Sequence, residues 1–416
     1  MQFITEEVIA NFFEDHDYDL RKSKYGRWID QKCTPDVLCF IADCILNCQK
    51  AVDGNCFITK DVWMNNYTIH QVQTVFKKPS PDCEKARNEY DKFFQQPMNL
   101  LAYSGVLGLR KVGRNNLYKI WHRDILEYIS MREQNSLIFL FHYISKVLTD
   151  SGVMCWFRYF MNDQTNESFS SLKNEFNSFT KKNTKIRNDK EIGRIFTKVL
   201  NPLSFFGNKR GTIQGAMSKD VITKDELMYN RYNFRDIYSD KPKGVTRKEY
   251  EEHERRVGHE SNPAYINYLA TKAKRLLRQY NDSFRNKLTE HIEDGHIRDE
   301  ATHIHHIFPE ASYPLISFYV ENLIALTPTQ HLNYAHPNGR TNEINEQYQQ
   351  LLLLSKADRI RENLEDSNVE HIYNFADLVY VLSIGFNCEN RLEIEEMDFE
   401  CVVHMINDYY FSRLPH

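Results

Sequence analysis

The chain has 416 residues, of which 41% are hydrophobic and 26% charged, and its formal net charge is −4. This length allows two or three domains, and the weak acidity excludes a protein that is basic overall, although a local basic face could still bind nucleic acid. No apolar run approaches the roughly twenty residues of a membrane span, and the N-terminus lacks the basic segment of a secretory signal, so we expect a cytoplasmic protein without a membrane partner. Nine cysteines without a C-x-x-C pair indicate free thiols in a reducing compartment, and no internal repeat is evident.

The first fifty residues predict two helices. Thr5 to Phe13 is amphipathic, and Thr34-Pro35-Asp36 is typical of a helix start because threonine caps and proline suits the first helical position. The stretch between them is polar and rich in cations, which predicts a loop that either faces phosphate or is simply solvated. Its cations are Arg21, Lys22, Lys24, Arg27 and Lys32.

The same stretch offers an alternative site. Asp19 followed by Asp30-Gln31-Lys32 has the Asp…Asp-x-Lys order of another metal-nuclease class, in which two acids bind Mg²⁺ and the lysine assists the attacking water. That class needs its acids on a hairpin of a buried sheet. Because this stretch is polar and runs into a helix, we favour the loop interpretation.

Residues 55 to 130 predict a winged helix. Helices are expected at Phe57 to Trp63 with a cap at Thr59, at Tyr67 to Phe76, and at Ala86 to Ser104 with a kink or break at Pro97. Val106 to Ile120 then predicts two strands around a turn, and a basic hairpin after three helices is typical of a DNA-binding wing. The candidate DNA-binding residues of this hairpin are Arg110, Lys111, Arg114 and Lys119. The alternative is a helical module that only docks against the rest of the chain.

Residues 131 to 235 are expected to be mostly helical, with a buried helix at Leu137 to Leu148. Two basic segments interrupt this region, Thr180 to Lys190 and Asn208 to Gly211. Either could contact a nucleic-acid backbone, although isolated charge runs are more often solvated surface.

A basic helix is predicted from Tyr265 to His291. Its candidate DNA-binding residues are Lys272, Arg275 and Arg278, which would increase affinity through counterion release. After the segment that follows, three more helices are expected at Ile344 to Lys356, Val369 to Ile384 and Phe399 to Tyr410.

The segment from His303 to His336 holds five of the sixteen histidines. His303-Ile304-His305-His306 alternates as a short strand would, and Asn322 to Leu326 is a second apolar run. Thr327-Pro328 predicts a helix start, with His331 on the opening turn, where the positive end of the helix dipole favours phosphate.

This segment resembles the HNH, or ββα-metal, nuclease motif over roughly residues 296 to 340, on the elements His305-His306, Asn322-Leu323 and Thr327 to His331. The resemblance implies that His305 and His331 are metal ligands and that His306 is the general base. It also implies that Asn322 braces the loop and fixes His306. Imidazole suits the base because its pKa lies near neutrality, and a divalent cation, Mg²⁺ first among candidates, would neutralise the departing oxygen.

His336 departs from the pattern. Many such motifs place a second helical ligand four residues after the first, but that position is Ala335 here. His336 would lie about 140° round an ideal helix from His331. Either the helix ends before Pro337 and His336 turns inward as a third ligand, or water or DNA completes the site.

We therefore expect an α+β, predominantly helical protein with a winged-helix-like module and an HNH motif. The expected domains are 1–130 for recognition, 131–240 as a helical middle region, and 241–416 for the nuclease with C-terminal helices. The combination resembles type II restriction endonucleases of bacterial restriction–modification systems. That resemblance implies sequence-specific cleavage of double-stranded DNA, a homodimer on DNA and a cognate DNA methyltransferase in the same system.

Two alternatives remain open. One is a non-catalytic DNA-binding regulator whose histidines, with Cys388 or Cys401, hold a structural zinc. The other is a coincidental cluster of core histidines.

Overall fold

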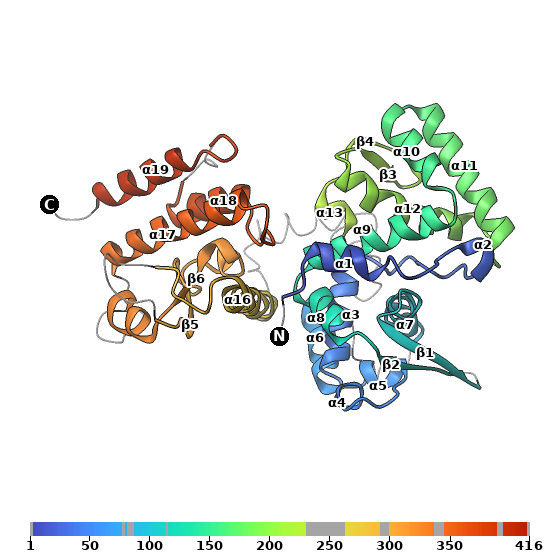
Figure 1. Ribbon diagram of the computed structural model, residues 1–416, viewed down its shortest axis with the longest axis horizontal. Coiled ribbons are helices and arrows are strands. Elements are labelled where there is room, and N and C mark those ends of the chain that lie inside the picture. The colour runs from blue at the N-terminus through green and yellow to red at the C-terminus, as the bar shows by residue number, and fades with distance from the viewer. Residues whose placement is uncertain are drawn as a thin grey trace. The chain divides into compact units, whose positions relative to one another are not determined.

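The computed structural model describes residues 3–76, 80, 87–113, 115–229, 263–291, 299–336, 345–388 and 394–413. The described chain is α+β and mostly helical, as expected, with three two-stranded antiparallel sheets (Figure 1). It divides into two compact units. We call Ile4–Glu260 the N-terminal unit, and Ser261–His416 together with Met1–Phe3 the C-terminal unit.

The N-terminal unit is built around α3 (Pro35–Leu46), whose residues Pro35 to Ile45 are all buried. Because α3 is mostly apolar and buried on every side, it is covered by helices on several faces, chiefly α8 (Arg123–Met131) and α9 (Glu133–Asp150). The expected boundary between residues 130 and 131 thus falls inside this unit. The other early helices are α1 (Glu6–Phe12), α2 (Leu20–Ser23), α4 (Gln49–Val52), α5 (Thr59–Trp63) and α6 (Asn66–Phe76).

A hairpin follows α7 (Arg87–Tyr103). Strands β1 (Leu107–Val112) and β2 (Asn115–Ile120) pair in register from Leu107 with Ile120 to Val112 with Asn115. Phe57 adds an isolated antiparallel bridge to Tyr118 of β2, so a residue preceding α5 lies along the hairpin.

Two local expectations differ from the structure at least in part. Helix α7 continues through Pro97 without a break, because the helix is anchored on both sides of the proline by the fully buried Phe94 and Met98. The cap of α5 is Ile58 rather than Thr59, since the Asp61 carboxylate accepts the Ile58 backbone N–H at 2.8 Å.

The rest of the N-terminal unit repeats the order of helices and hairpin. Its elements are α10 (Met154–Asp163), α11 (Asn166–Asn183), α12 (Asp189–Phe206), β3 (Arg210–Ile213), β4 (Ala216–Val221) and α13 (Lys224–Leu227). Helix α12 packs on both α9 and α11 and on strand β3.

The C-terminal unit places a third hairpin between helices. Strands β5 (His303–His306) and β6 (Leu323–Leu326) lie against α16 (Pro263–Phe284), which ends before the expected His291. The loop between the strands holds two 3₁₀ turns, η2 (Pro314–Ile316) and η3 (Val320–Asn322). A π-helix, η4 (Gln330–Ala335), follows β6, and α17 (Glu346–Glu365), α18 (Phe375–Gly385) and α19 (Phe399–Phe411) complete the unit.

The cysteines and the apolar helices bear on two of the expectations from the sequence. The eight cysteines in the described ranges are free thiols. Among the described residues, no single helix has the length and apolarity to cross a membrane. The α9–α10 pair meets both criteria only when joined, and it bends by 115° at the junction.

The close contact between Gly385 and Phe308 allows the packing of the C-terminal unit to be tested by mutation. A Cβ there would lie 2.2 Å from the Phe308 ring, and that ring is buried at the start of the β5–β6 loop. We expect Gly385→Ala to lower the free energy of unfolding by about 1–3 kcal/mol through overpacking. Far-UV circular dichroism during urea unfolding measures the loss.

The control is Gly193→Ala on α12, where a Cβ would meet no atom within 4 Å. It should raise stability by about 0.5–1 kcal/mol, because alanine loses less backbone entropy than glycine. All four tryptophans lie within Ile4–Glu260, so fluorescence follows the N-terminal unit and should respond only to the control. An unchanged urea midpoint of the circular-dichroism transition for Gly385→Ala would mean that the loop around Phe308 shifts to accommodate the added methyl group.

Candidate metal centre and catalytic histidine

The β5–β6 hairpin sets which face each histidine occupies. His303 pairs with Leu326 and His306 with Leu323 in an antiparallel register. Since side chains alternate along a strand, His303 and His305 share one face and His306 points to the other. Strand β6 is buried throughout, which keeps the hairpin fixed against the core.

The turn after β6 is closed by a reciprocal pair of hydrogen bonds. The Gln330 backbone N–H donates to Thr327 Oγ1 at 3.1 Å, and the Thr327 N–H donates to Gln330 Oε1 at 3.0 Å. This is a capping box, so the expected helix start at Thr327 is confirmed. Gln330 also accepts from Thr289 Oγ1 at 2.6 Å and donates to the His291 carbonyl at 2.9 Å, which ties the helix start to the segment after α16.

The segment that follows is a π-helix over Gln330–Ala335. A π-helix closes its backbone hydrogen bonds from i to i+5, so residues five apart lie nearly above one another. His331 and His336 are five apart, and their ring centroids are 5.0 Å apart. His336 itself leaves the helix with an extended backbone. Of the two expected arrangements, His336 therefore adopts the one in which it turns inward.

Three imidazoles converge as a result. The ring centroid of His305 lies 5.2 Å from that of His331 and 5.0 Å from that of His336. One ligand atom of each residue lies within 4.8 Å of the others, so this group could hold a metal ion. The Nδ1 atom of His331 is buried without a hydrogen-bond partner, as expected of an atom that awaits a ligand.

Burial sets the charge of this group. Desolvation, followed by the charges of neighbouring histidines, lowers the pKa of His305 to about 3 and that of His331 to about 4. Both rings are therefore neutral at pH 7. Metal ligation requires a neutral imidazole, so these two rings are already in the protonation state that binds a metal.

His306 has a different environment. Its Nε2–H donates to the Ser317 carbonyl at 3.0 Å, and Glu310 lies 3.9 Å from the same nitrogen. This bond assigns the proton to Nε2 and leaves Nδ1 with a free lone pair. Burial and the nearby charge of Lys274 lower the pKa of His306, opposed by the Ser317 carbonyl and Glu310.

Asn322 is fully buried and braces the loop between the strands. Its side chain accepts the Phe308 N–H at 2.8 Å and donates to the carbonyls of Phe308 and Ile316 at 3.0 and 3.2 Å. The loop so held carries Ser317, which orients His306. Asn322 is thus a positioning residue.

A buried network that the sequence analysis missed holds the other strand. Glu290 accepts the backbone N–H of Ala325 in β6 at 2.7 Å. Lys356 Nζ lies 3.1 Å from the Glu290 carboxylate and donates to Tyr373 Oη at 2.8 Å, and both charged side chains are fully buried. Nothing local in the sequence marks the pairing of Glu290 with Lys356, because the two residues are far apart in the chain.

The basic helix α16 contributes differently from expectation. Arg278 donates to the Thr302 carbonyl just before β5, at 3.1 Å, and Lys272 lies over the Tyr268 ring at 4.6 Å. Arg275 is exposed. Lys274, not among the expected DNA-binding residues, is the α16 cation whose charge acts on both His305 and His306.

The expected wing residues lie on the β1–β2 hairpin. Arg110, Lys111 and Lys119 are exposed, and Arg114 lies outside the described residues. The exposed side chains could contact a polyanion without rearrangement.

The alternative acid–acid–lysine site does not assemble. Asp19 accepts from Arg21 at 2.9 Å, Asp30 from Arg27 at 2.7 Å, and Lys32 pairs with Glu89. Each charge of the Asp…Asp-x-Lys order is therefore neutralised by a different partner.

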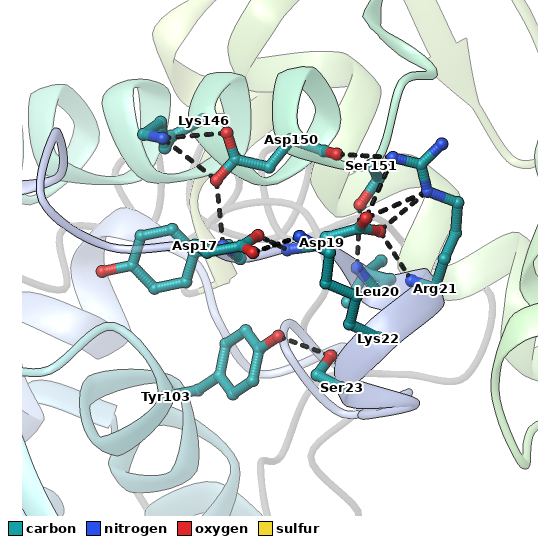
Figure 2. A network of polar contacts seen from close by, with 11 residues as sticks. Asp17, Asp19, Leu20, Arg21, Lys22, Ser23, Tyr103, Lys146, Asp150 and Ser151 are labelled. Carbon is teal, nitrogen blue, oxygen red and sulfur yellow. Dashed lines mark hydrogen bonds and ion pairs between the residues drawn. The ribbon is translucent and has the colours of Figure 1, made fainter.

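Figure 2 shows the network around Asp19. Lys22 pairs with Asp17, and the Leu20 N–H donates to Ser151 Oγ at 3.1 Å. The polar loop is thereby fastened to the end of α9. It is not a free phosphate-facing segment.

Comparison with known protein families, with curated proteins and with solved structures found no match to this chain.

The buried carboxyl group of Glu321, next to Asn322, should make the stability of the protein depend on pH. Burial, followed by the charge of Asp377, raises the pKa of Glu321 to about 7. The folded protein keeps this proton between pH 4.5 and 7, where the unfolded chain loses it. The contribution of Glu321 to stability should therefore fall across that window, by at most about 1.4 kcal/mol per pH unit, while the lowered pKa values of His305 and His331 contribute in the opposite direction. Urea unfolding by circular dichroism at pH 5 to 8 measures the slope.

Glu321→Gln should remove this contribution and make the slope of stability against pH more positive than that of the parent, since the amide cannot ionise but can still accept the Asn374 N–H. The exposed Glu396→Gln is the control and should leave the slope as in the parent. Equal slopes for the parent and Glu321→Gln would mean that Glu321 is ionised in the folded protein.

Proposed function

We propose that the C-terminal unit is an HNH-type nuclease centre that hydrolyses phosphodiester bonds of double-stranded DNA. The observation that carries the proposal is the pair of adjacent imidazoles with different surroundings. His305 joins His331 and His336 in a group that could hold a metal ion, whereas His306 is oriented by the Ser317 carbonyl with Nδ1 left to accept a proton.

The ligand set bears on which metal is bound. Three neutral imidazoles suit Zn²⁺, Ni²⁺ and similar transition metals, whereas Mg²⁺ prefers oxygen ligands. We therefore favour a transition metal over the Mg²⁺ expected from the sequence. Such a cation supplies Lewis acidity toward the phosphate and the leaving 3′ oxygen.

The number of ligand residues favours an enzyme over a structural zinc protein. Closed structural sites use four protein ligands, while catalytic sites use three and leave one position for water or substrate. Within the described residues, the group comprises three histidines and contains neither Cys388 nor Cys401.

The proton path follows from the hydrogen bonds of His306. Nδ1 takes a proton from the attacking water, and the Ser317 carbonyl holds the Nε2 proton and stabilises the imidazolium that forms. Asn322 keeps Ser317 in place through its bonds to the loop. Lys274 adds positive charge where the phosphate would lie.

Recognition is assigned to the N-terminal unit. A winged helix is supported by the order α3, α5–α6, α7 and then the β1–β2 hairpin, with Phe57 bridged to the hairpin in the place of the short first strand. Arg110, Lys111 and Lys119 of the hairpin would contact the DNA backbone. A site-specific enzyme of this kind would act as a restriction endonuclease. Two copies would cut both strands, and a methyltransferase would protect the host.

His306→Ala tests the general base. Loss of the base should lower the rate of cleavage by at least about 100-fold. Several unmethylated plasmid and phage DNAs incubated with Zn²⁺, Ni²⁺, Mn²⁺ or Mg²⁺, with and without chelator, provide the assay. Duplex binding and metal binding should remain at the level of the parent protein. Cleavage at the parental rate would refute the role of His306, and loss of metal binding would indicate a structural one.

His336→Ala tests the third ligand. Removing one of three ligands should weaken Zn²⁺ or Ni²⁺ binding by more than the about 10- to 100-fold that loss of an outer-shell partner costs. Competition with a chelating dye measures the affinity. The matched control is His303→Ala, which removes a ring stacked on His331 but outside the three-histidine group. Equal affinities of the two variants would count against His336 as a ligand.

A further inference from the structure

The N-terminal unit contains two stretches with the same order of elements. Helices α5 and α6, the longer α7, the β1–β2 hairpin and α8 form the first. Helices α10, α11 and α12, the β3–β4 hairpin and α13 form the second (Figure 1). We call these the first and second wing modules.

The sequences of the two modules correspond at the junctions. Asn99 precedes Gly105 with the same spacing as Asn201 precedes Gly207, at the end of the long helix in each module. After the hairpin, Arg123-Asp-Ile-Leu corresponds to Lys224-Asp-Glu-Leu. The separation between equivalent positions is nearly constant, which is typical of an internal repeat.

The packing corresponds as well. Each first strand has glycine at its second position, facing the residue that directly follows the second strand. A Cβ on Gly108 would lie 2.3 Å from the Trp121 ring, and one on Gly211 would lie 2.7 Å from Ile222. Only glycine permits this close approach in either hairpin.

The helix asparagine clamps the hairpin in both modules. Asn99 Oδ1 accepts from the Tyr118 hydroxyl of β2 at 2.7 Å. Asn201 accepts the Thr212 N–H of β3 at 2.9 Å and donates to its carbonyl at 3.0 Å. Two helices, a clamped hairpin and matching junctions together make the second module a structural counterpart of the first.

The exposed face of α12 is more basic than that of α7. Among the side chains of α7 that the structure describes, Asp91, Lys92 and Gln95 are exposed, so the exposed acid offsets the exposed cation. On α12, Lys190 and Arg194 are exposed one turn apart, in the N-terminal half, where a recognition helix contacts base edges.

The acids beside these cations are already neutralised. Asp189 pairs with Lys181, and Glu191 pairs with Arg27 of the polar loop. Between the cations, Gly193 leaves open space above the helix backbone. The hairpin adds the exposed Arg210 and Lys219. Among the described residues, no ion pair involves Lys190, Arg194 or these two hairpin cations.

We infer that α12 and the β3–β4 hairpin form a second binding surface for double-stranded DNA, with Arg194, Arg210 and Lys219 as backbone or base contacts. The inference rests on the proposed function and extends it. Recognition is shared between two wing modules, and α12 is the helix suited to the major groove.

The test measures duplex binding without cleavage. The full chain carrying His306→Ala is titrated in chelator with a fluorescent 30-base-pair duplex of arbitrary sequence at several salt concentrations. Adding Arg194→Gln, Arg210→Gln and Lys219→Gln should flatten the plot of log affinity against log salt by about 0.9 per lost phosphate contact. Changing Arg110, Lys111 and Lys119 to Gln in the same way measures how much the first module contributes to the salt dependence of binding. The control is Lys22→Gln, a cation already paired with Asp17.

The outcomes separate the two proposals. An unchanged slope for the second-module variant, with a flattened slope for the first-module variant, overturns the second surface and leaves the proposed function intact. Failure of the parent to bind any duplex overturns the proposed function and this inference with it. Tryptophan fluorescence melts, which report on the N-terminal unit, must match the parent for a flattened slope to support the inference.

Discussion

The candidate metal centre depends on one buried side chain, Gln330, which is hydrogen-bonded in three directions. It caps the turn after β6 through Thr327 and is held from behind by Thr289 and the His291 carbonyl. Since His331 directly follows Gln330, the anchoring fixes the position from which the first helical ligand projects. Glu290 secures β6 in the same way, through the Ala325 N–H. Imidazoles from a strand and a helix can converge only because both elements are fastened to the same short segment after α16.

The π-helix explains how a sequence spacing unsuited to an α-helix still yields a three-histidine group. In an α-helix, residues five apart diverge by about 140°. One extra residue per turn brings His336 back above His331, and the extended backbone at His336 completes the approach. π-helical turns are uncommon and occur frequently at functional sites, since the irregular hydrogen bonding costs stability. The stability lost through this irregular hydrogen bonding is consistent with a site selected for the geometry of its ligands.

The sequence predicted those features that local patterns determine. The alternation in His303-Ile304-His305-His306, the Thr327 cap and the two strands within Val106 to Ile120 all appear where they were expected. It could not predict the features that depend on tertiary partners. Pro97 remains inside α7 because buried neighbours hold the helix together, and the Glu290–Lys356 pair joins residues far apart in the chain. The three-histidine group was predicted in part. The motif indicated His305 and His331 as ligands, whereas the position of His336 depends on the π-helix, which the sequence did not predict.

Charge pairing within the N-terminal unit decides which of its many cations remain available. Arg21, Lys22 and Lys32 each have an acidic partner, so most of the positive charge of the polar loop is offset by neighbouring acids. Arg27 also neutralises Glu191 at the start of α12. The loop thereby removes negative charge from the helix that presents Lys190 and Arg194. A net charge of −4 is compatible with a nucleic-acid-binding face on these grounds, because long-range attraction depends on where unpaired charges lie rather than on their total.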